Sequence, residues 1–252
     1  MNTVLSETSG RIRTITFNRP HRLNAMTEEL VEDYAAALDA ANRSDEVDVI
    51  VLRGAGKAFC AGDDLKEFES QARTPEHTHR YLGRVQDTVR AMLQGEKPIV
   101  GAVHGWAAGG GFEWAIDCDL LVMGEGARCF FPEISLGFIV TGGVTALLPR
   151  LIGLQRARAM ILFGEKMGAR ELHDMGLVHK VVPDDAVHTE ARALAERIAQ
   201  LPQPAVRGLK RVMNRALDLD MESVLELERA TVTEGFFDPD TLGRVKSAPP
   251  RR

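Results

Sequence analysis

The chain has 252 residues, of which 44% are hydrophobic and 27% charged, proportions typical of a globular protein and not of a disordered or fibrous one. Its formal net charge of −5 gives no broad positive surface for nucleic acid or for an acidic membrane. We therefore predict a small-molecule partner, and neither nucleic acid nor a membrane.

The first predicted elements are a strand and a helix. Residues 11–17 alternate polar and apolar side chains and include β-branched residues, which predicts a half-buried strand before Pro20. Thr27 can then cap a helix whose first turn holds Glu28 and Glu29 and whose apolar residues share one face.

The middle of the chain alternates between strand and helix patterns. Short apolar runs, typical of strands buried on both faces, lie at 47–52, 98–103, 119–123 and 179–183. Helical spacing fills the stretches between them, at about 75–94, 109–117 and 154–176. This alternation predicts an α/β protein with βα units around a mainly parallel sheet.

After Pro183 the strand pattern stops, and three helices are predicted at 186–200, 204–219 and 221–237. Their apolar stripes need a surface to pack on, either the core or a neighbouring subunit. We therefore divide the chain into a core at 1–190 and a helical region at 191–252. The basic end, APPRR at 248–252, is predicted to be disordered.

The three cysteines form an odd set without CxxC spacing, which is typical of a reducing compartment. The chain does not begin with a signal-peptide pattern, and it has no apolar run of the roughly 18 residues that span a bilayer. A cytoplasmic location is predicted. His77 and His79 form an isolated HxH without a Cys/His cluster or HExxH, so no metal is predicted.

Two glycine-containing segments each follow a predicted strand. AFCAGDDLKEF at 58–68 and GWAAGGGFEWAIDCDLLV from 105 can expose backbone N–H groups, the second at the start of a helix. Facing each other, they could form an oxyanion hole with two donors; the same glycines also fit simple tight turns. GAGK at 54–57 lacks the spacing and the Ser or Thr of a phosphate-binding P-loop.

A third segment, FFPEISLGFIVTGG at 130–143, places Glu133 among apolar residues, and Glu113 follows the triple glycine. Burial raises the pKa of a carboxyl group, so the two could serve together as acid and base. Taken singly, each also fits an ordinary surface or salt-bridged glutamate.

In this order, the three segments resemble the crotonase, or enoyl-CoA hydratase/isomerase, superfamily. The resemblance extends from about Arg11 to Pro183 and includes RPHRLNAM at 19–26. It implies a crotonase-like spiral of ββα units with a C-terminal helical region used in assembly. It also implies homotrimers, often paired into homohexamers.

The resemblance assigns roles to individual residues. The amides of Asp63 and Gly110 are the implied oxyanion donors for an acyl-CoA thioester. Glu113 and Glu133 match the two carboxylates that serve water addition, which implies an enoyl-CoA hydratase. A Δ3,Δ2-enoyl-CoA isomerase that uses Glu133 alone, or another crotonase-type enzyme, is the first alternative. A non-catalytic protein that binds acyl-CoA or a partner is the second.

The implied substrate site is larger than these residues. Coenzyme A belongs to the substrate, so no separate cofactor is expected, and its phosphates are expected near Arg22 or Lys66. Phe138 is the preferred acyl-pocket residue. The implied binding residues are Arg22, Ala61, Gly62, Asp63, Asp64, Leu65, Lys66, Gly109, Gly110 and Phe138.

Two positions depart from the family pattern. Asp63 stands where many relatives have a small residue, and a carboxylate beside a developing enolate is unfavourable unless it points away or is paired. Ile139, Val140 and Thr141 replace the usual Pro-Gly loop. These departures bear on the acyl group accepted more than on the fold.

Overall fold

A mainly parallel sheet forms the centre of the computed structural model, which describes residues 2–67 and 74–247. Within these residues its order is β1-β2-β3-β4-β6-β9, and only the β1–β2 pair is antiparallel. The strands are β1 Val4–Ser9, β2 Ile12–Phe17, β3 Val49–Gly54, β4 Ile99–Val103, β6 Leu120–Gly124 and β9 Lys180–Val182. The predicted α/β class and parallel sheet are confirmed.

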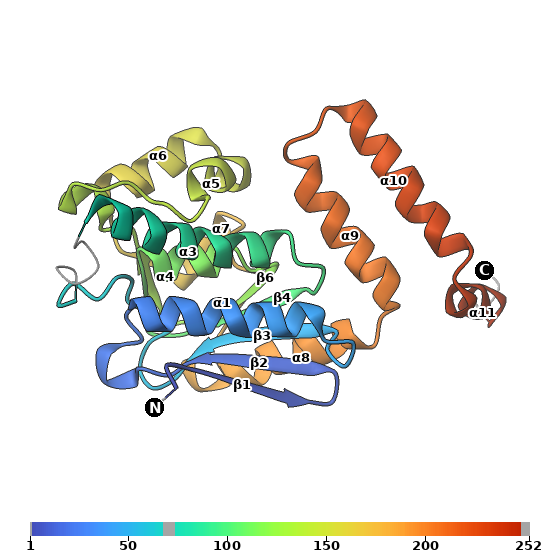
Figure 1. Ribbon diagram of the computed structural model, residues 1–252, viewed down its shortest axis with the longest axis horizontal. Helices are drawn as coiled ribbons and strands as arrows, with labels where there is room; N and C mark the ends of the chain where they lie inside the picture. The colour runs from blue at the N-terminus through green and yellow to red at the C-terminus, as the bar shows by residue number, and fades with distance from the viewer. Residues whose placement is uncertain (1, 68–73, 248–252) are drawn as a thin grey trace.

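Helices cover both faces of this sheet (Figure 1). The helices α1 (Glu28–Arg43) and α3 (Pro75–Leu93) lie side by side on one face. On the other face, α8 (Val187–Ala199) packs against strand residues such as Val49 and Val100. Covered on both sides, β4 is buried throughout, as its continuous apolar run predicted.

Local capping explains where the two long helices begin. The Thr27 hydroxyl accepts a hydrogen bond from the Leu30 amide at 3.2 Å, which confirms the predicted cap. Thr74 caps α3 through the His77 amide at 3.1 Å, and Pro75 occupies the first turn, where its missing N–H carries no cost.

A smaller sheet and several short helices complete the core. The sheet has the order β5-β7-β8, with β5 Trp106–Ala108, β7 Arg128–Phe130 and β8 Met167–Gly168. The helices are α4 Gly110–Ile116, α5 Val144–Ile152, α6 Leu154–Phe163 and α7 Ala169–Asp174, with 3-10 turns η1 Pro20–Arg22, η2 Glu133–Leu136 and η3 Asp184–Ala186. The single helix predicted over 154–176 is wrong: Gly164, at φ +59°, ends α6, and β8 separates it from α7.

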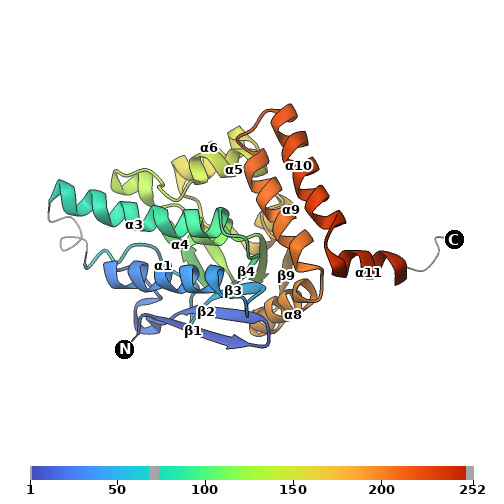
Figure 2. The ribbon, with the colours of Figure 1, turned by 45° about the vertical axis from the view of Figure 1, so that its right-hand side comes forward.

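The C-terminal region is helical, as predicted, and projects from the core (Figure 2). The helices are α9 Gln203–Ala216, α10 Met221–Phe236 and α11 Pro239–Ser247, and α9 and α10 pack against each other. The division at residue 190 stays a prediction, since α8 runs across that position. The tail at 248–252 lies outside the described residues. Within the described ranges, no helix has both the length and the hydropathy of a membrane span.

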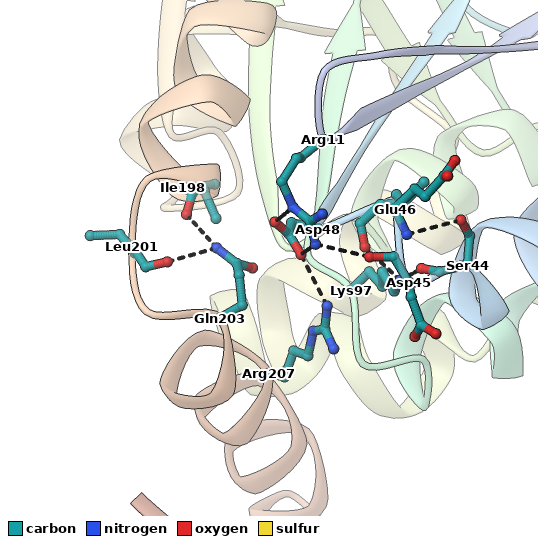
Figure 3. A network of polar contacts seen from close by, with 11 residues as sticks. Arg11, Ser44, Asp45, Glu46, Asp48, Lys97, Ile198, Leu201, Gln203 and Arg207 are labelled. Carbon is teal, nitrogen blue, oxygen red and sulfur yellow. Dashed lines mark hydrogen bonds and ion pairs between the residues drawn. The ribbon is translucent and has the colours of Figure 1, made fainter. Parts of the chain in front are cut away.

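Charged side chains link α9 to the amino ends of strands in the large sheet (Figure 3). Asp48, 1% exposed, lies just before β3 and pairs with Arg11 and, at 3.0 Å, with Arg207 of α9. Nearby, Lys97 before β4 donates to the carbonyl oxygens of Ser44 and Val47. Asp48 and Lys97 lie at the amino ends of the parallel strands β3 and β4. The glycine-containing segments follow the carboxyl ends of the same strands.

Candidate active site

The two glycine-containing segments meet at the carboxyl ends of the neighbouring strands β3 and β4. The amide of Cys60 donates to Trp106 O at 3.1 Å, and the amide of Ala108 donates back to Cys60 O at 3.0 Å. A Cβ atom on Gly62 would lie 2.7 Å from Ala108 O, so a side chain at this position would separate the segments. The backbone pairing therefore brings the 60–64 turn beside the start of α4.

Each segment presents an amide that has no hydrogen-bond partner among the described residues. Within residues 2–67 and 74–247, neither the Asp63 N–H nor the Gly110 N–H donates a hydrogen bond. The preceding Gly109 has φ +52°, and a Cβ there would lie 2.5 Å from Glu133 Oε1. Glycine is thus required for the backbone to turn at this point with a carboxylate against it.

Glu113 is a buried carboxyl group held by two amides. It is 2% exposed on α4 and accepts hydrogen bonds from Thr141 N at 3.0 Å and from Gly142 N. Burial, reinforced by the negative charge of Glu133, raises its pKa to about 7, although both amide hydrogen bonds act in the opposite direction. The carboxyl group therefore has a fixed orientation and can exchange a proton near neutral pH.

Glu133 is the second carboxyl group of the site and begins the 3-10 turn η2. Its Oε1 lies against Gly109, and its Oε2 is buried without a hydrogen-bond partner in the described chain. Burial raises its pKa to about 7, and the nearby charge of Asp63 adds to this rise. An unpaired buried oxygen of this kind is costly to ionise and is free to handle a proton.

The Asp63 side chain is paired. Its Oδ1 accepts a hydrogen bond of 2.7 Å from the hydroxyl of Tyr81, a residue of α3 that is 5% exposed. Asp63 keeps an exposed edge, but burial of the carboxyl group raises its pKa, and the hydrogen bond from Tyr81 opposes that rise. The unusual Asp63 side chain thus has a specific partner, Tyr81 of helix α3.

This environment predicts a pH-dependent stability cost at Glu133. With a folded pKa of about 7 and an unfolded value of 4.5, the folded state binds more protons between these values, so stability falls as pH rises through the window. Glu133→Gln removes the charge and should stabilise the protein by about 1–2 kcal/mol at about pH 8 and by almost nothing below about pH 4.5. Urea unfolding at both pH values measures this; a variant less stable than wild type at the higher pH contradicts it.

The 61–66 stretch has a mixed environment. Ala61 is half-buried and donates its amide to Leu23 O at 3.0 Å, whereas the Leu65 side chain is 63% exposed and Lys66 is exposed. Asp64 is buried and accepts from the Lys66 amide at 3.2 Å. Of this stretch, therefore, Leu65 and Lys66 offer their side chains to a ligand, while Asp64 stabilises the turn.

The two remaining predicted binding residues are accessible. Arg22 is partly exposed, with Nε 4.0 Å from the Asp64 carboxylate. Phe138 is 49% exposed, and its amide donates to Glu133 O at 2.9 Å, so the ring lies just after the turn that carries the second carboxyl group. Both side chains are near the site and are not committed to the core.

Several residues that order the site were not identified from the sequence. Arg19, inside the RPHRLNAM motif, binds Ala25 O and forms an ion pair of 3.1 Å with Asp64, which joins the 19–26 turn to the 61–64 turn. The amides of Thr141 and Gly142 orient Glu113. Tyr81 has no local signature, and the motif that contains Arg19 does not specify its pairing with Asp64, which lies 45 residues away.

Among the residues that the structure describes, no group of three or more His, Cys, Asp or Glu side chains is arranged to hold a metal ion. The chemical groups that the structure brings together at the site are two amide donors and two carboxyl groups with pKa values near 7, with Asp63 beside them. Amide donors stabilise negative charge on an oxygen, and such carboxyl groups exchange protons near neutral pH.

Comparison with known proteins places this geometry in context. The model of a family described as "Enoyl-CoA hydratase/isomerase" matches residues 7–242. The chain is 39% identical over 238 residues to a "Probable enoyl-CoA hydratase" of Rhizobium meliloti, covering 94% of this chain and 91% of the relative. It is 32% identical over 231 residues to a "1,2-epoxyphenylacetyl-CoA isomerase" of Escherichia coli, covering 91% and 88%.

Solved structures agree with the fold. The chain superposes on the crystal structure of an enoyl-CoA hydratase from Bacillus anthracis with a TM-score of 0.92 and 30% identity, covering 97% of this chain and 95% of that one. A putative enoyl-CoA hydratase from Streptomyces coelicolor gives a TM-score of 0.93 at 27% identity, covering 98% and 93%. The expected crotonase-like fold with a helical C-terminal region is thereby confirmed.

Proposed function

The chain belongs to the enoyl-CoA hydratase/isomerase family, and from this premise we propose that it is an enoyl-CoA hydratase that adds water reversibly to a trans-2-enoyl-CoA. One observation carries the proposal: two carboxyl groups, both with pKa values raised to about 7, stand beside two backbone amides that donate no hydrogen bond within the part of the chain that the structure describes. Hydration needs a base for water and an acid for carbon, and this site offers both.

The proposed mechanism begins at the thioester. Its carbonyl oxygen accepts hydrogen bonds from the Asp63 and Gly110 amides, which draws electron density from the double bond towards that oxygen. One glutamate, ionised, takes a proton from water as the water oxygen bonds to C3. The resulting enolate then collapses, and C2 takes a proton from the other glutamate. The product carries the OH group on C3 and the new hydrogen on C2. Preorganised amides are usually the largest catalytic contribution in such reactions.

Coenzyme A, as part of the substrate, is proposed to lie along the 61–66 stretch. Exposed Leu65 can cover the adenine, and Arg22 and Lys66 can approach the phosphates. Phe138 is proposed to line the acyl pocket. A separate cofactor is not part of the proposal, and a cytoplasmic location stays a prediction.

We also propose assembly into trimers or hexamers. The C-terminal helices carry exposed apolar side chains, among them Met213 at 61%, Phe236 at 69% and Phe237 at 79%. Exposed apolar surface of this kind is typical of protein interfaces. Sedimentation of the full chain distinguishes a monomer from either assembly.

The direct test uses purified protein and crotonyl-CoA, followed by the loss of the enoyl thioester absorbance. Rapid loss, with the 3-hydroxyacyl product identified by mass spectrometry, supports hydration. If no enoyl-CoA of any chain length is hydrated although coenzyme A thioesters bind, the hydratase proposal fails, and the isomerase or the non-catalytic binding protein takes its place.

Glu113 separates hydration from Δ3,Δ2-isomerisation of an enoyl-CoA, the alternative reaction considered for this site. Glu113→Gln should lower kcat for hydration about 100-fold, because one of two proton-transferring groups is lost. A Δ3,Δ2-isomerase that moves a proton through Glu133 alone should keep most of its activity. Assays of the variant with a 2-enoyl-CoA and a 3-enoyl-CoA decide between them; hydration that survives intact contradicts the assignment.

A further inference from the structure

One face of α3 lies beside three of the segments that build the candidate site. Tyr81 and Thr88 are seven residues apart and buried, so they lie on the same side of the helix. The Tyr81 hydroxyl binds the Asp63 carboxylate at 2.7 Å, on the first amide-bearing turn. The Thr88 hydroxyl accepts a hydrogen bond of 2.8 Å from Nε1 of Trp114, on the helix α4 that begins with the second amide.

The same face reaches the segment that orients Glu113. A Cβ atom on Gly143 would lie 3.6 Å from Cγ1 of Val89, so a methyl group there would contact α3. The helix is therefore close to the loop whose Thr141 and Gly142 amides hold the Glu113 carboxylate. The helix is therefore positioned to act as a common support for the 60–64 turn, for α4 and for the 141–143 loop.

The Tyr81–Asp63 contact is the strongest of these links. An O–H group that donates to a carboxylate forms a charge-assisted hydrogen bond, and 2.7 Å is within the range of such bonds. Burial raises the pKa of Tyr81 well above its usual value, so the phenol stays protonated and remains a donor. The carboxylate is thereby drawn towards α3.

We propose that Tyr81 is a positioning residue for the reaction: its hydroxyl holds the Asp63 carboxylate against α3, which fixes the Asp63 amide and keeps the carboxylate charge away from the thioester oxygen. The inference rests on the proposed function, since it concerns the same oxyanion donors. Without the phenol, the carboxylate is free to turn towards an oxygen that becomes negative, and the amide loses its tether.

The test is Tyr81→Phe, with Tyr34→Phe as a matched control. The chain has two tyrosines, both buried, and the Tyr34 hydroxyl donates a hydrogen bond to the Met92 sulfur at 3.1 Å rather than to a residue of the candidate site. Tyr81→Phe should lower kcat for crotonyl-CoA hydration about tenfold and change KM less than about threefold, because a misplaced donor weakens the transition state more than the ground state. Tyr34→Phe should leave both constants within about twofold.

A double-mutant cycle distinguishes positioning from packing. In an Asp63→Ala background, which keeps the amide but has no carboxylate to hold, Tyr81→Phe should lower kcat by less than about twofold. An equal loss in both backgrounds overturns the proposal, because Tyr81 would then act only through its contribution to the core.

Ligand binding keeps the test independent of turnover. Acetoacetyl-CoA ionises to an enolate with near-ultraviolet absorbance, whereas butyryl-CoA stays neutral. Tyr81→Phe should weaken binding of the enolate about tenfold and of butyryl-CoA less than about threefold. If wild type binds both ligands but hydrates nothing, the hydratase proposal fails while the role of Tyr81 is still measured. Equal effects of Tyr81→Phe on the binding of both ligands, or no binding by wild type, overturn the proposed positioning role of Tyr81.

Discussion

Replacing Glu133 by Gln is expected to lower kcat for the hydration of crotonyl-CoA by about 10³–10⁴-fold, the upper part of the range for a lost general acid or base. Glutamine keeps the size of the side chain but cannot take or give the proton. Glu133 should be the more sensitive of the two carboxyl groups, since its buried Oε2 has no partner in the described chain and is free for substrate or water.

The measurement compares steady-state kcat and KM of the variant with wild type. Glu125→Gln is the control, because the Glu125 side chain is 59% exposed and forms a surface ion pair with Arg170. The variant should keep KM within about threefold if the loss is confined to the chemical step. A Glu133→Gln protein with more than about a tenth of wild-type kcat contradicts the proposed role.

The loss of activity should accompany a gain in stability at high pH. The raised pKa shows that ionised Glu133 is disfavoured in the folded state, and an enzyme that keeps such a group gives up stability for a proton-transferring carboxylate. An inactive but more stable variant therefore indicates a catalytic role for Glu133. Removal of a residue with a structural role would lower both activity and stability.

Gly110→Pro is expected to lower kcat about 10²–10³-fold, the typical effect of losing one oxyanion donor. Proline lacks the amide hydrogen, and Gly110 is the first residue of α4, where proline is tolerated in a helix. The substitution thus removes the proposed donor with little disturbance of the helix.

Gly110→Ala is the matched control, because it adds a Cβ but keeps the N–H. In both variants that Cβ would lie 2.8 Å from the Met26 sulfur, a flexible side chain that can move aside. The ratio of kcat between the alanine and proline variants therefore reports the loss of the N–H together with the ring carbon that replaces its hydrogen, and the Cβ effect cancels. If the two variants differ by less than about threefold while circular dichroism shows both folded, the Gly110 amide is not an oxyanion donor.

Elements with local sequence signals could be predicted before the fold was known. Hydrophobic periodicity identified the buried parallel strands, and Thr27, followed by an acidic turn, marked the start of α1 where the structure has it. The edge strand β1 was missed because its residues are mostly exposed and carry no burial pattern, and α5 was missed because it follows a glycine-rich loop. Glu113 and Glu133 were predicted as catalytic residues from the motifs in which they lie.

The pairing of Asp63 and Glu113 with their hydrogen-bond partners follows from the tertiary structure and not from local sequence. Asp63 stood out as a charged residue at a position where a small one is usual, but its partner Tyr81 lies 18 residues away, across a helix boundary. The amides that orient Glu113 lie 28 and 29 residues beyond it. Such pairings depend on how helices and loops pack in three dimensions. Local sequence patterns report burial and backbone conformation, and do not specify which distant group a side chain meets.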